Sequence, residues 1–251
     1  MLITGAAGRI GTYYRGHLAN VGAPWRLRLQ DMRAIDDPGD AEVEIGDLAD
    51  INVARSAVAG AHTILHLAAD PSPAADFYAT LLDRNIKATY NIFAAAAEAG
   101  ARRVIFASSV NAVIGYPKDV QPHTHMIARP GNVYDATKVW GEALAASFSV
   151  QHGLSCIAVR IGGFTPPERL RSRFNQDHDD SRVSPSMIVT AADLSRLFDC
   201  CLAAPADLDF AVVHGLSANR YPGMELDSTR RLLGYEPQDD AFALAEALAE
   251  E

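Results

Sequence analysis

The chain has 251 residues, of which 49% are hydrophobic, and its formal net charge is −9. A chain of this length can bury one sizeable core without metals or disulfides. The acidic balance argues against a surface that neutralises nucleic-acid phosphates, because such binding depends on clustered Lys and Arg. We therefore expect a single domain over residues 1–251 that binds no nucleic acid and that meets any anionic ligand through locally placed basic groups.

The three cysteines, Cys156, Cys200 and Cys201, lack the spacing of a zinc site or a redox pair. They are expected to be buried thiols in a reducing compartment. No apolar stretch approaches the roughly twenty residues needed to span a bilayer, and the N-terminus lacks the pattern of a signal peptide. These features predict a cytoplasmic protein without membrane contact.

Short apolar runs alternate with longer segments of helical period, which predicts repeated strand–helix–strand units around a parallel sheet. Strands are expected at residues 1–4, 25–30, 43–45, 63–66, 104–107, 155–160 and 210–213. Helices are expected at residues 9–21, 51–59, 77–99, 134–152 and 191–203, the first ending at Gly22. The predicted fold is α/β, a Rossmann-type doubly wound parallel sheet.

Between residues 162 and 186 the pattern gives way to a stretch rich in Pro, Arg, Asp and Asn, whose length is typical of a functional loop. The chain after it is too short for an independent domain. Residues 162–190 and 214–251 are expected to form a small substrate-binding lobe. Asp177-His178-Asp179-Asp180 offers metal-binding side chains, but adjacent loop residues cannot readily converge on one ion, so no metal site is predicted.

The first strand runs directly into Thr4-Gly5-Ala6-Ala7-Gly8-Arg9-Ile10-Gly11, a Gly-x-x-Gly-x-x-Gly turn that opens a helix. Glycines there let the backbone approach a pyrophosphate, which the N–H groups at the helix start bind. Asp31, after the second strand, can accept hydrogen bonds from both ribose hydroxyls of NAD and repels a 2′-phosphate. Arg33 could instead bind a 2′-phosphate, so NAD is favoured and NADP is the weaker alternative.

Further cofactor contacts are predicted where later strands end. Asp47-Leu48 follows the third strand and fits the adenine end, although a helix N-cap explains Asp47 equally well. Leu67-Ala68-Ala69 follows the fourth strand and offers small side chains where a dinucleotide passes. The residues predicted from these patterns to bind the cofactor are Gly5, Gly8, Arg9, Ile10, Gly11, Asp31, Asp47, Leu48, Leu67, Ala68 and Ala69.

Tyr134 and Lys138 lie four residues apart and therefore share one face of a helix. A free tyrosine has a pKa of about 10, and an adjacent lysine cation stabilises its phenolate and lowers that pKa. The strand at 104–107 runs into Ser108-Ser109, which places a hydroxyl at the edge where open α/β sheets bind ligands. We expect Ser109 to hold the substrate oxygen while Tyr134 moves the proton, with Ser108 as the alternative serine.

With these motifs in this order, the chain resembles the extended short-chain dehydrogenase/reductase family, of the NAD-dependent epimerase/dehydratase type, over essentially its whole length. The resemblance implies that Tyr134 is the general acid/base, that Lys138 lowers its pKa and binds the nicotinamide ribose, and that Ser109 orients the substrate. Asn85 would maintain the geometry beside the site, although packing at a helix start explains it equally well. The further cofactor contacts that the resemblance implies are Asn85, Ala107, Tyr134, Lys138 and Ile161.

Within that family the chain is similar to the uronate (hexuronate) dehydrogenases, which oxidise a sugar acid at its anomeric carbon with NAD. The motifs are scattered along the chain and include Phe106-Ala107-Ser108-Ser109, Tyr116-Pro117, Val159-Arg160-Ile161-Gly162, Thr165-Pro166 and Leu233-Gly234-Tyr235-Glu236-Pro237. The substrate-binding residues that this resemblance implies are Ser108, Ser109, Asn111, Tyr134, Gly163, Arg171 and Arg173.

The chain departs from the uronate dehydrogenases at the substrate site. Their serine after Arg-Ile-Gly is Gly163 here, and their histidine two residues after the catalytic serine is Asn111. Their arginine for the sugar carboxylate would fall near Ser172, so Arg171 or Arg173 is expected to supply a bidentate clamp. The predicted function is an NAD-dependent oxidoreductase that acts on a CH–OH group of a sugar or sugar acid.

Two alternative functions remain open at this point. One is an NAD-dependent sugar or sugar-nucleotide epimerase or dehydratase, in which the hydride is taken and returned. The other is a catalytically silent dinucleotide-binding protein. The helices at 77–99 and 134–152 have more apolar positions than one face needs, and such helices pair across a two-fold axis in this family, which predicts a homodimer.

Overall fold

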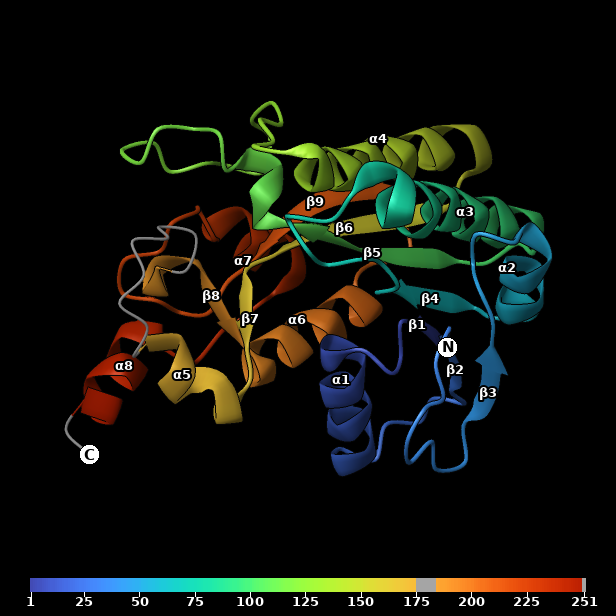
Figure 1. Cartoon of the computed structure of the whole chain (residues 1–251), viewed down its shortest axis with the longest axis horizontal. Helices are drawn as coiled ribbons and strands as arrows, with labels where there is room; N and C mark the ends of the chain where they lie inside the picture. Colours follow the sequence, from blue (N-terminus) through green and yellow to red (C-terminus); the bar gives the residue numbers. More distant parts are fainter. Residues whose placement is uncertain (175–183, 250–251) are drawn as a thin grey trace.

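The computed structural model describes residues 1–174 and 184–249, apart from the side chain of Arg171. Within these residues a seven-stranded sheet forms the centre, with strand order β3-β2-β1-β4-β5-β6-β9 (Figure 1). Neighbouring strands pair in parallel throughout it. The strands are β1 (Leu2–Thr4), β2 (Arg28–Asp31), β3 (Glu42–Ile45), β4 (Thr63–His66), β5 (Arg103–Ser109), β6 (Ser155–Ile161) and β9 (Phe210–Gly215). The Rossmann-type doubly wound sheet is confirmed.

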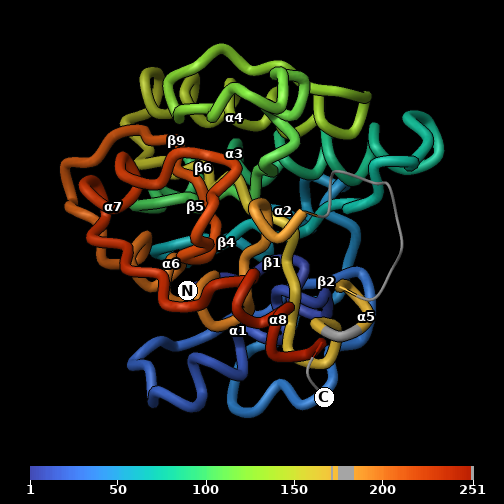
Figure 2. The backbone as a smooth tube through the Cα atoms, turned by 90° about the vertical axis from the view of Figure 1, so that its left-hand side faces the viewer, coloured from blue at the N-terminus to red at the C-terminus, as the bar shows by residue number. Residues whose placement is uncertain are grey.

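Helices cover both faces of this sheet, as the two perpendicular views in Figures 1 and 2 show. One face carries α2 (Ile51–Val58), α3 (Ala88–Glu98) and α4 (Val133–His152), which pack side by side. The other face carries α1 (Arg9–Asn20) and α6 (Ala191–Ala203). The central strands β4 and β6 are buried along their whole length, so both faces of the sheet need a layer of helices.

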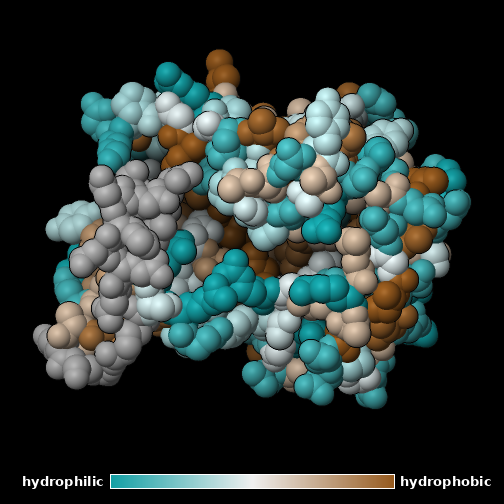
Figure 3. All heavy atoms as spheres, viewed as in Figure 1, coloured by the Kyte–Doolittle hydropathy of each residue, from teal (hydrophilic) through white to brown (hydrophobic). Residues whose placement is uncertain are grey.

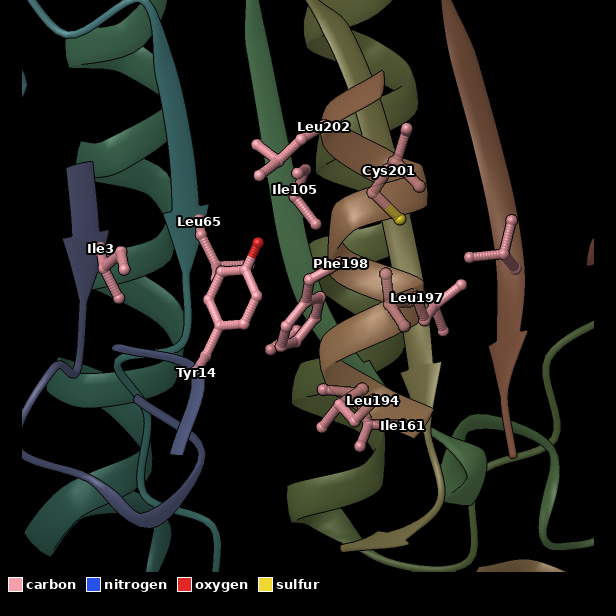
Figure 4. Packing of buried hydrophobic residues seen from close by; sticks show 14 of the residues in the cluster. Ile3, Tyr14, Leu65, Ile105, Ile161, Leu194, Leu197, Phe198, Cys201 and Leu202 are labelled. Carbon is pink, nitrogen blue, oxygen red and sulfur yellow. The ribbon is translucent and has the colours of Figure 1, made fainter. Parts of the chain in front are cut away.

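Hydrophobic side chains fill the space between the sheet and the layer of α1 and α6 (Figure 4). Tyr14 of α1 lies edge-on to Phe198 of α6, with ring centroids 5.1 Å apart. Leu65 of β4 and Ile105 of β5 belong to the same buried cluster. The Tyr14 hydroxyl also donates a hydrogen bond of 2.9 Å to Asp199. These contacts hold α1 against the sheet and thereby fix the glycine-rich turn that precedes it.

Several boundaries predicted from the sequence are wrong. β2 begins at Arg28 rather than at residue 25, because Trp25 is 40% exposed and lies outside the sheet. β5 continues through Ser108 and Ser109, so both serines are strand residues. The single helix expected at 77–99 is a π-helical segment, η1 (Phe77–Lys87), followed by α3.

The stretch expected to be an irregular loop contains regular structure in its described part. β7 (Gly163–Thr165) pairs in parallel with β8 (Ile188–Thr190), outside the main sheet. Residues 177–180, the candidate metal-binding sequence, lie outside the described residues. The other elements of this part of the chain are η3 (Pro167–Arg169), α5 (Leu170–Phe174) and η5 (Pro185–Met187). Two further helices, α7 (Asp227–Leu233) and α8 (Ala241–Ala249), follow β9. α8 packs against α5 and β8, so these segments gather at one end of the molecule (Figure 1).

Two of the three cysteines are buried. Cys156 and Cys201 are buried free thiols, whereas Cys200 is only half-buried, which corrects the expectation that all three are buried.

Among residues 1–174 and 184–249, no group of three or more His, Cys, Asp or Glu side chains could hold a metal ion. No helix in that part of the chain combines the length and apolarity needed to cross a membrane.

Gly141 lets α4 lie close to β5 at the level of the predicted site. A Cβ atom at this position would come within 2.2 Å of the Phe106 ring. That ring is 3% exposed, and its centroid lies 5.5 Å from the Nζ atom of Lys138 and 6.0 Å from the ring of His66. Any larger residue at position 141 must therefore displace an aromatic ring that packs against the site.

We predict that Gly141→Ala destabilises the protein by about 1–3 kcal/mol, because overpacking forces a buried ring from its place. The matched control is Gly16→Ala in α1, where an added Cβ meets no atom within 4 Å. This control should be neutral or stabilising by up to about 1 kcal/mol, since alanine is the better helix former. Urea unfolding of both variants tests the contrast, and equal effects would contradict it.

Candidate active site

A cavity of about 490 Å³ opens beside the carboxyl ends of β1, β2 and β4. The strand order reverses between β1 and β4, and open α/β sheets bind ligands at such a point. The space-filling view shows a hollow near the centre of the molecule with hydrophobic atoms at its floor (Figure 3). The predicted cofactor residues that line the cavity are Gly5, Gly8, Arg9, Asp31, Asp47, Leu48, Leu67, Ala68 and Ala69.

The glycine-rich turn is as tight as the sequence predicts. Gly5 has φ +66°, and a Cβ atom there would lie 2.7 Å from the backbone nitrogen of Ala68. A Cβ atom at Gly11 would lie 2.6 Å from the carbonyl oxygen of Gly5. Gly5 therefore permits the close approach of the two strand ends that form the cavity. Gly11 instead packs the first turn of α1 onto the turn and is not among the lining residues of the cavity.

Asp31 is held rigidly at one end of the cavity. It is 7% exposed, and its Oδ2 and Oδ1 atoms accept hydrogen bonds from the backbone N–H groups of Ala7 (2.9 Å) and Arg33 (3.1 Å). The Arg33 side chain donates to the carbonyl of Ala7 (2.9 Å), and its Nε lies 3.6 Å from Asp31 Oδ1. The carboxylate thus lines the cavity with its orientation fixed by its neighbours.

Asp47 lines the cavity and is not the N-cap of α2, which removes the alternative explanation of that residue. Its Oδ1 accepts a hydrogen bond from the backbone of Ala49 (2.9 Å). Asp50 is the N-cap instead, since its side chain accepts from the backbone of Asn52 (2.8 Å).

A second cavity of about 590 Å³ lies at the carboxyl ends of β5 and β6. It shares Arg9, Leu67, Ala69 and Pro71 with the first cavity, so the two are adjacent. The predicted site residues that line it are Arg9, Ile10, Leu67, Ala69, Ala107, Ser108, Ser109, Asn111, Tyr134, Lys138, Ile161, Gly163 and Arg173. The residues predicted for catalysis therefore converge on one space, beside the space predicted for a cofactor.

Tyr134 and Lys138 are both buried in the wall of the second cavity. The Nζ atom of Lys138 donates to the Ala107 carbonyl (3.0 Å) and lies 5.7 Å from the centre of the Tyr134 ring. Burial lowers the pKa of Lys138 to about 8. Burial also raises the pKa of Tyr134 to about 12, against a hydrogen bond with Ser109 that lowers it. A tyrosine in this setting needs the adjacent cation if it is to lose its proton near neutral pH.

The two serines at the end of β5 have different surroundings. The Ser108 hydroxyl donates a hydrogen bond of 2.6 Å to the buried Glu142 carboxylate. The Ser109 hydroxyl oxygen accepts from the backbone of Asn111 (3.1 Å) and interacts with Tyr134. Ser109 is therefore the serine beside the tyrosine, whereas the Ser108 hydroxyl faces the helix layer.

Asn85 lies in the π-helical segment η1 and does not line either cavity. Its side-chain amide donates to the Asp70 carbonyl (3.2 Å) and to the Thr137 hydroxyl (3.1 Å). Its Oδ1 accepts from the Asp70 backbone (2.8 Å). Asn85 thus ties the loop after β4 to α4, one residue from Lys138, and π-helical turns are frequent at such functional positions.

Arg173, one of the two arginines expected to bind a sugar carboxylate, lines the second cavity. Its guanidinium lies against Gly163, since a Cβ atom on that glycine would be 2.8 Å from Nη2. Ser172 is exposed and its hydroxyl donates to the Arg169 carbonyl (3.1 Å). Arg171 belongs to α5, but its side chain lies outside the described residues. Gly163 therefore makes room for a cation where a serine would crowd it.

Two features of the site were not predicted from the sequence. The loop residues Pro71, Ser72, Pro73 and Ala74 line the second cavity, and the two prolines in the loop after β4 are the signal that could have revealed them. Glu142 was the second, although its position four residues after Lys138 places it on the same helix face as Tyr134 and Lys138.

Comparisons with known proteins agree with this geometry. The model of the NAD dependent epimerase/dehydratase family matches residues 1–204. An NAD-dependent glucose-6-phosphate dehydrogenase of Haloferax volcanii is 33% identical over 260 residues, covering 96% of this chain and 94% of that protein. A uronate dehydrogenase of Agrobacterium fabrum is 33% identical over 251 residues, covering 100% of this chain and 88% of that protein.

Among solved structures, a mutant uronate dehydrogenase from Agrobacterium tumefaciens in complex with NAD has a TM-score of 0.85. It is 32% identical in sequence, and the match covers 99% of this chain and 88% of that chain. In this chain the glycine-rich turn follows β1, the buried Asp31 ends β2, and the Tyr134–Lys138 pair lies on α4, which packs against the sheet. The chain belongs to the NAD dependent epimerase/dehydratase family.

Proposed function

We propose that the protein is an NAD-dependent dehydrogenase that oxidises a CH–OH group of a sugar or sugar acid. The observation that carries this proposal is the convergence of Ser109, Tyr134 and Lys138 on a cavity that shares its wall with the dinucleotide cavity. The relatives matched over nearly the whole chain are dehydrogenases of sugars or sugar acids.

The residues around the first cavity fit NAD. Gly5 and Gly8 bring bare backbone to its edge, where a Cβ on either would meet backbone atoms within 3.0 Å. Asp31 offers a fixed carboxylate for the adenosine ribose and repels a 2′-phosphate, which favours NAD over NADP. Bound NAD supplies a hydride acceptor. Gly11 and Asn85 line neither cavity and are proposed to hold the lining residues in place. The residues proposed to hold NAD are Gly5, Gly8, Arg9, Ile10, Asp31, Asp47, Leu48, Leu67, Ala68, Ala69, Ala107, Tyr134, Lys138 and Ile161.

The chemistry assigned to the protein's own residues is proton transfer at the substrate hydroxyl. Tyr134, as the phenolate, accepts the proton of that hydroxyl as its carbon is oxidised. Lys138 stabilises the phenolate by its charge. Ser109 donates a hydrogen bond to the same substrate oxygen and keeps it within reach of Tyr134.

The charge of the second cavity favours an anionic sugar. Arg9, Lys138 and Arg173 line it, and none of its described lining residues is Asp or Glu, although the chain carries a net charge of −9. Arg173 offers a planar guanidinium that can bind a carboxylate through two hydrogen bonds. The two relatives that are 33% identical are named for a uronate and for glucose 6-phosphate, both anionic sugars. A sugar acid held by Arg173 is accordingly the substrate class we propose, with Asn111 beside Ser109 bonding a sugar hydroxyl.

The first test of this function measures NADH formation from NAD with uronic acids, sugar phosphates, neutral aldoses and sugar alcohols. We expect an anionic sugar to be oxidised and Tyr134→Phe to lower the rate by about 10²-fold or more, because the proton acceptor is lost. Tyr78→Phe is the matched control, since Tyr78 is 82% exposed. Sugar isomerisation without net NADH would indicate an epimerase, and NAD binding without any turnover would indicate a silent binding protein.

Replacing Lys138 should move the pH dependence of oxidation. Removal of a cation raises the pKa of the adjacent phenol, so the rising limb of kcat/KM against pH should shift to higher pH in Lys138→Met. At neutral pH the variant should therefore be slower than wild type, and raising the pH should restore part of the rate. A profile that falls in height without shifting would show that Lys138 does not act on Tyr134.

We also propose that the protein forms a homodimer through α3 and α4. These helices pack side by side, and Tyr90 and Val150 on them are 49% and 87% exposed. An apolar face of two adjacent helices suits a two-fold contact in which each copy presents the same surface. Light scattering should give twice the chain mass, and Val150→Glu should shift the protein towards monomer. A monomeric wild-type protein at high concentration would refute the proposal.

A further inference from the structure

A buried ion pair lies directly behind the catalytic side chains. Tyr134, Lys138 and Glu142 follow one another at four-residue intervals on the face of α4 that meets the sheet. The Glu142 carboxylate accepts two hydrogen bonds from Arg160 of β6, at 2.9 Å from Nε and 2.8 Å from Nη2. The side chains of Glu142 and Arg160 are 8% and 3% exposed. One turn beyond the lysine, the helix thus presents a carboxylate whose charge is matched by a cation from the sheet.

The same carboxylate reaches the strand that carries the catalytic serine. The Ser108 hydroxyl donates to Glu142 Oε1 (2.6 Å), and Ser109 is the next residue of β5. Three hydrogen bonds from two strands therefore end on one carboxylate of α4. Since Ser109 belongs to β5 and Lys138 to α4, this junction sets the distance between two of the catalytic groups.

Stability alone does not account for such a pair. Removing two charges from water is costly, and apolar residues of similar volume often serve as well or better in a protein interior. The Arg160 Nη1 atom is also buried without a hydrogen-bond partner among the described residues, so the pair is not optimally solvated. Its position next to Lys138 indicates a role in the electrostatics of the site.

Other titratable and charged groups also surround the site. Burial lowers the pKa of His66 to about 3 and that of His214, beside Arg160 on β9, to about 4, so both rings are neutral at physiological pH. Asp70 and Asp135 act on Tyr134 from the loop after β4 and from α4 itself. Arg9 and Arg173 lie on the cavity side.

Resting on the proposed dehydrogenase function, we propose that Glu142 and Arg160 are positioning residues, in which Arg160 neutralises Glu142 and so leaves the Lys138 cation to act on Tyr134. An unneutralised carboxylate one turn from Lys138 would offset the field that stabilises the phenolate. The bond from Ser108 to Glu142 couples this balance to the placement of Ser109.

Two single variants should change the pH dependence in opposite directions. Arg160→Met leaves a buried negative charge, which raises the pKa of Tyr134 and moves the rising limb of kcat/KM for oxidation to higher pH by about one unit. Glu142→Gln leaves a buried positive charge, which moves the same limb to lower pH. The double variant Glu142→Gln/Arg160→Met restores the balance and should return the limb close to its wild-type position.

The matched control is Arg103→Met, which removes another buried arginine from the opposite end of β5. Arg103 donates to the Ser155 hydroxyl (2.9 Å) and to the carbonyls of Cys201 and Ala204 (2.9 Å each), far from the catalytic cavity. This variant should lower Tm without moving the pH limb. Shifts of the same sign in both single variants, or no shift in either, would show that the pair is merely structural.

Two further measurements separate the role of the ion pair from poor folding of a variant and from the proposed dehydrogenase function. Arg160→Lys retains the charge and should keep the wild-type pH limb while kcat falls, because the bidentate geometry is lost. The pKa of Tyr134 can also be read without turnover, from the phenolate absorbance that is lost in Tyr134→Phe. If the two single variants shift the Tyr134 pKa in opposite directions but the protein oxidises no sugar, the role of the ion pair is supported and the dehydrogenase function is refuted. If the protein oxidises a sugar but the pKa shifts are absent, the dehydrogenase function is supported and the role of the ion pair is refuted.

Discussion

The Lys138 ammonium group is buried between α4 and β5, and much of the site can be understood from that placement. Its Nζ atom has one carbonyl partner at 3.0 Å and two aromatic rings within 6 Å, so it is poorly solvated. Burial lowers its pKa to about 8. A charge in a protein interior acts more strongly on its neighbours than a charge in water does. The burial that makes the lysine costly to charge would also strengthen the effect on Tyr134 that we propose for it.

Several neighbouring residues help to keep Lys138 buried. Gly141 allows the Phe106 ring to lie under the helix, next to the lysine. The neutral His66 ring is tilted against Phe106, with ring centroids 6.0 Å apart, and adds no competing charge near neutral pH. Asn85 fixes the adjacent turn of α4 through Thr137. Residues outside the two cavities thus help to keep the lysine buried and in place.

The two cavities illustrate how a parallel sheet brings distant parts of a chain together. Their walls come from the ends of several strands, which all point their carboxyl ends to one edge. The protein is acidic as a whole, yet Arg9 and Arg173 supply positive charge at the catalytic cavity. A locally reversed charge of this kind suits the anionic substrate that we propose, without making the entire surface basic.

Most of the fold followed from local patterns in the sequence. The alternation of strands and helices, the glycine-rich turn and the spacing of Tyr134 and Lys138 depend on periodicity and backbone freedom, which neighbouring residues determine. Element ends were less predictable, since β2 starts three residues later than expected where Trp25 leaves the sheet. The short strands β7 and β8 were missed because each is stabilised by a partner distant in the sequence.

At the site, the sequence by itself determined which residue types were available and in what order, and these named the Tyr–Lys pair, the serines and Asp31. Only the tertiary structure showed that Ser109 lies beside Tyr134 while the Ser108 hydroxyl donates to Glu142, since this difference depends on Glu142 lying across the helix–sheet interface. It also placed Arg173 rather than Ser172 at the cavity and joined Arg160 to Glu142 behind Lys138. These outcomes depend on side chains brought together by packing between strands and helices far apart in sequence, which no local pattern records.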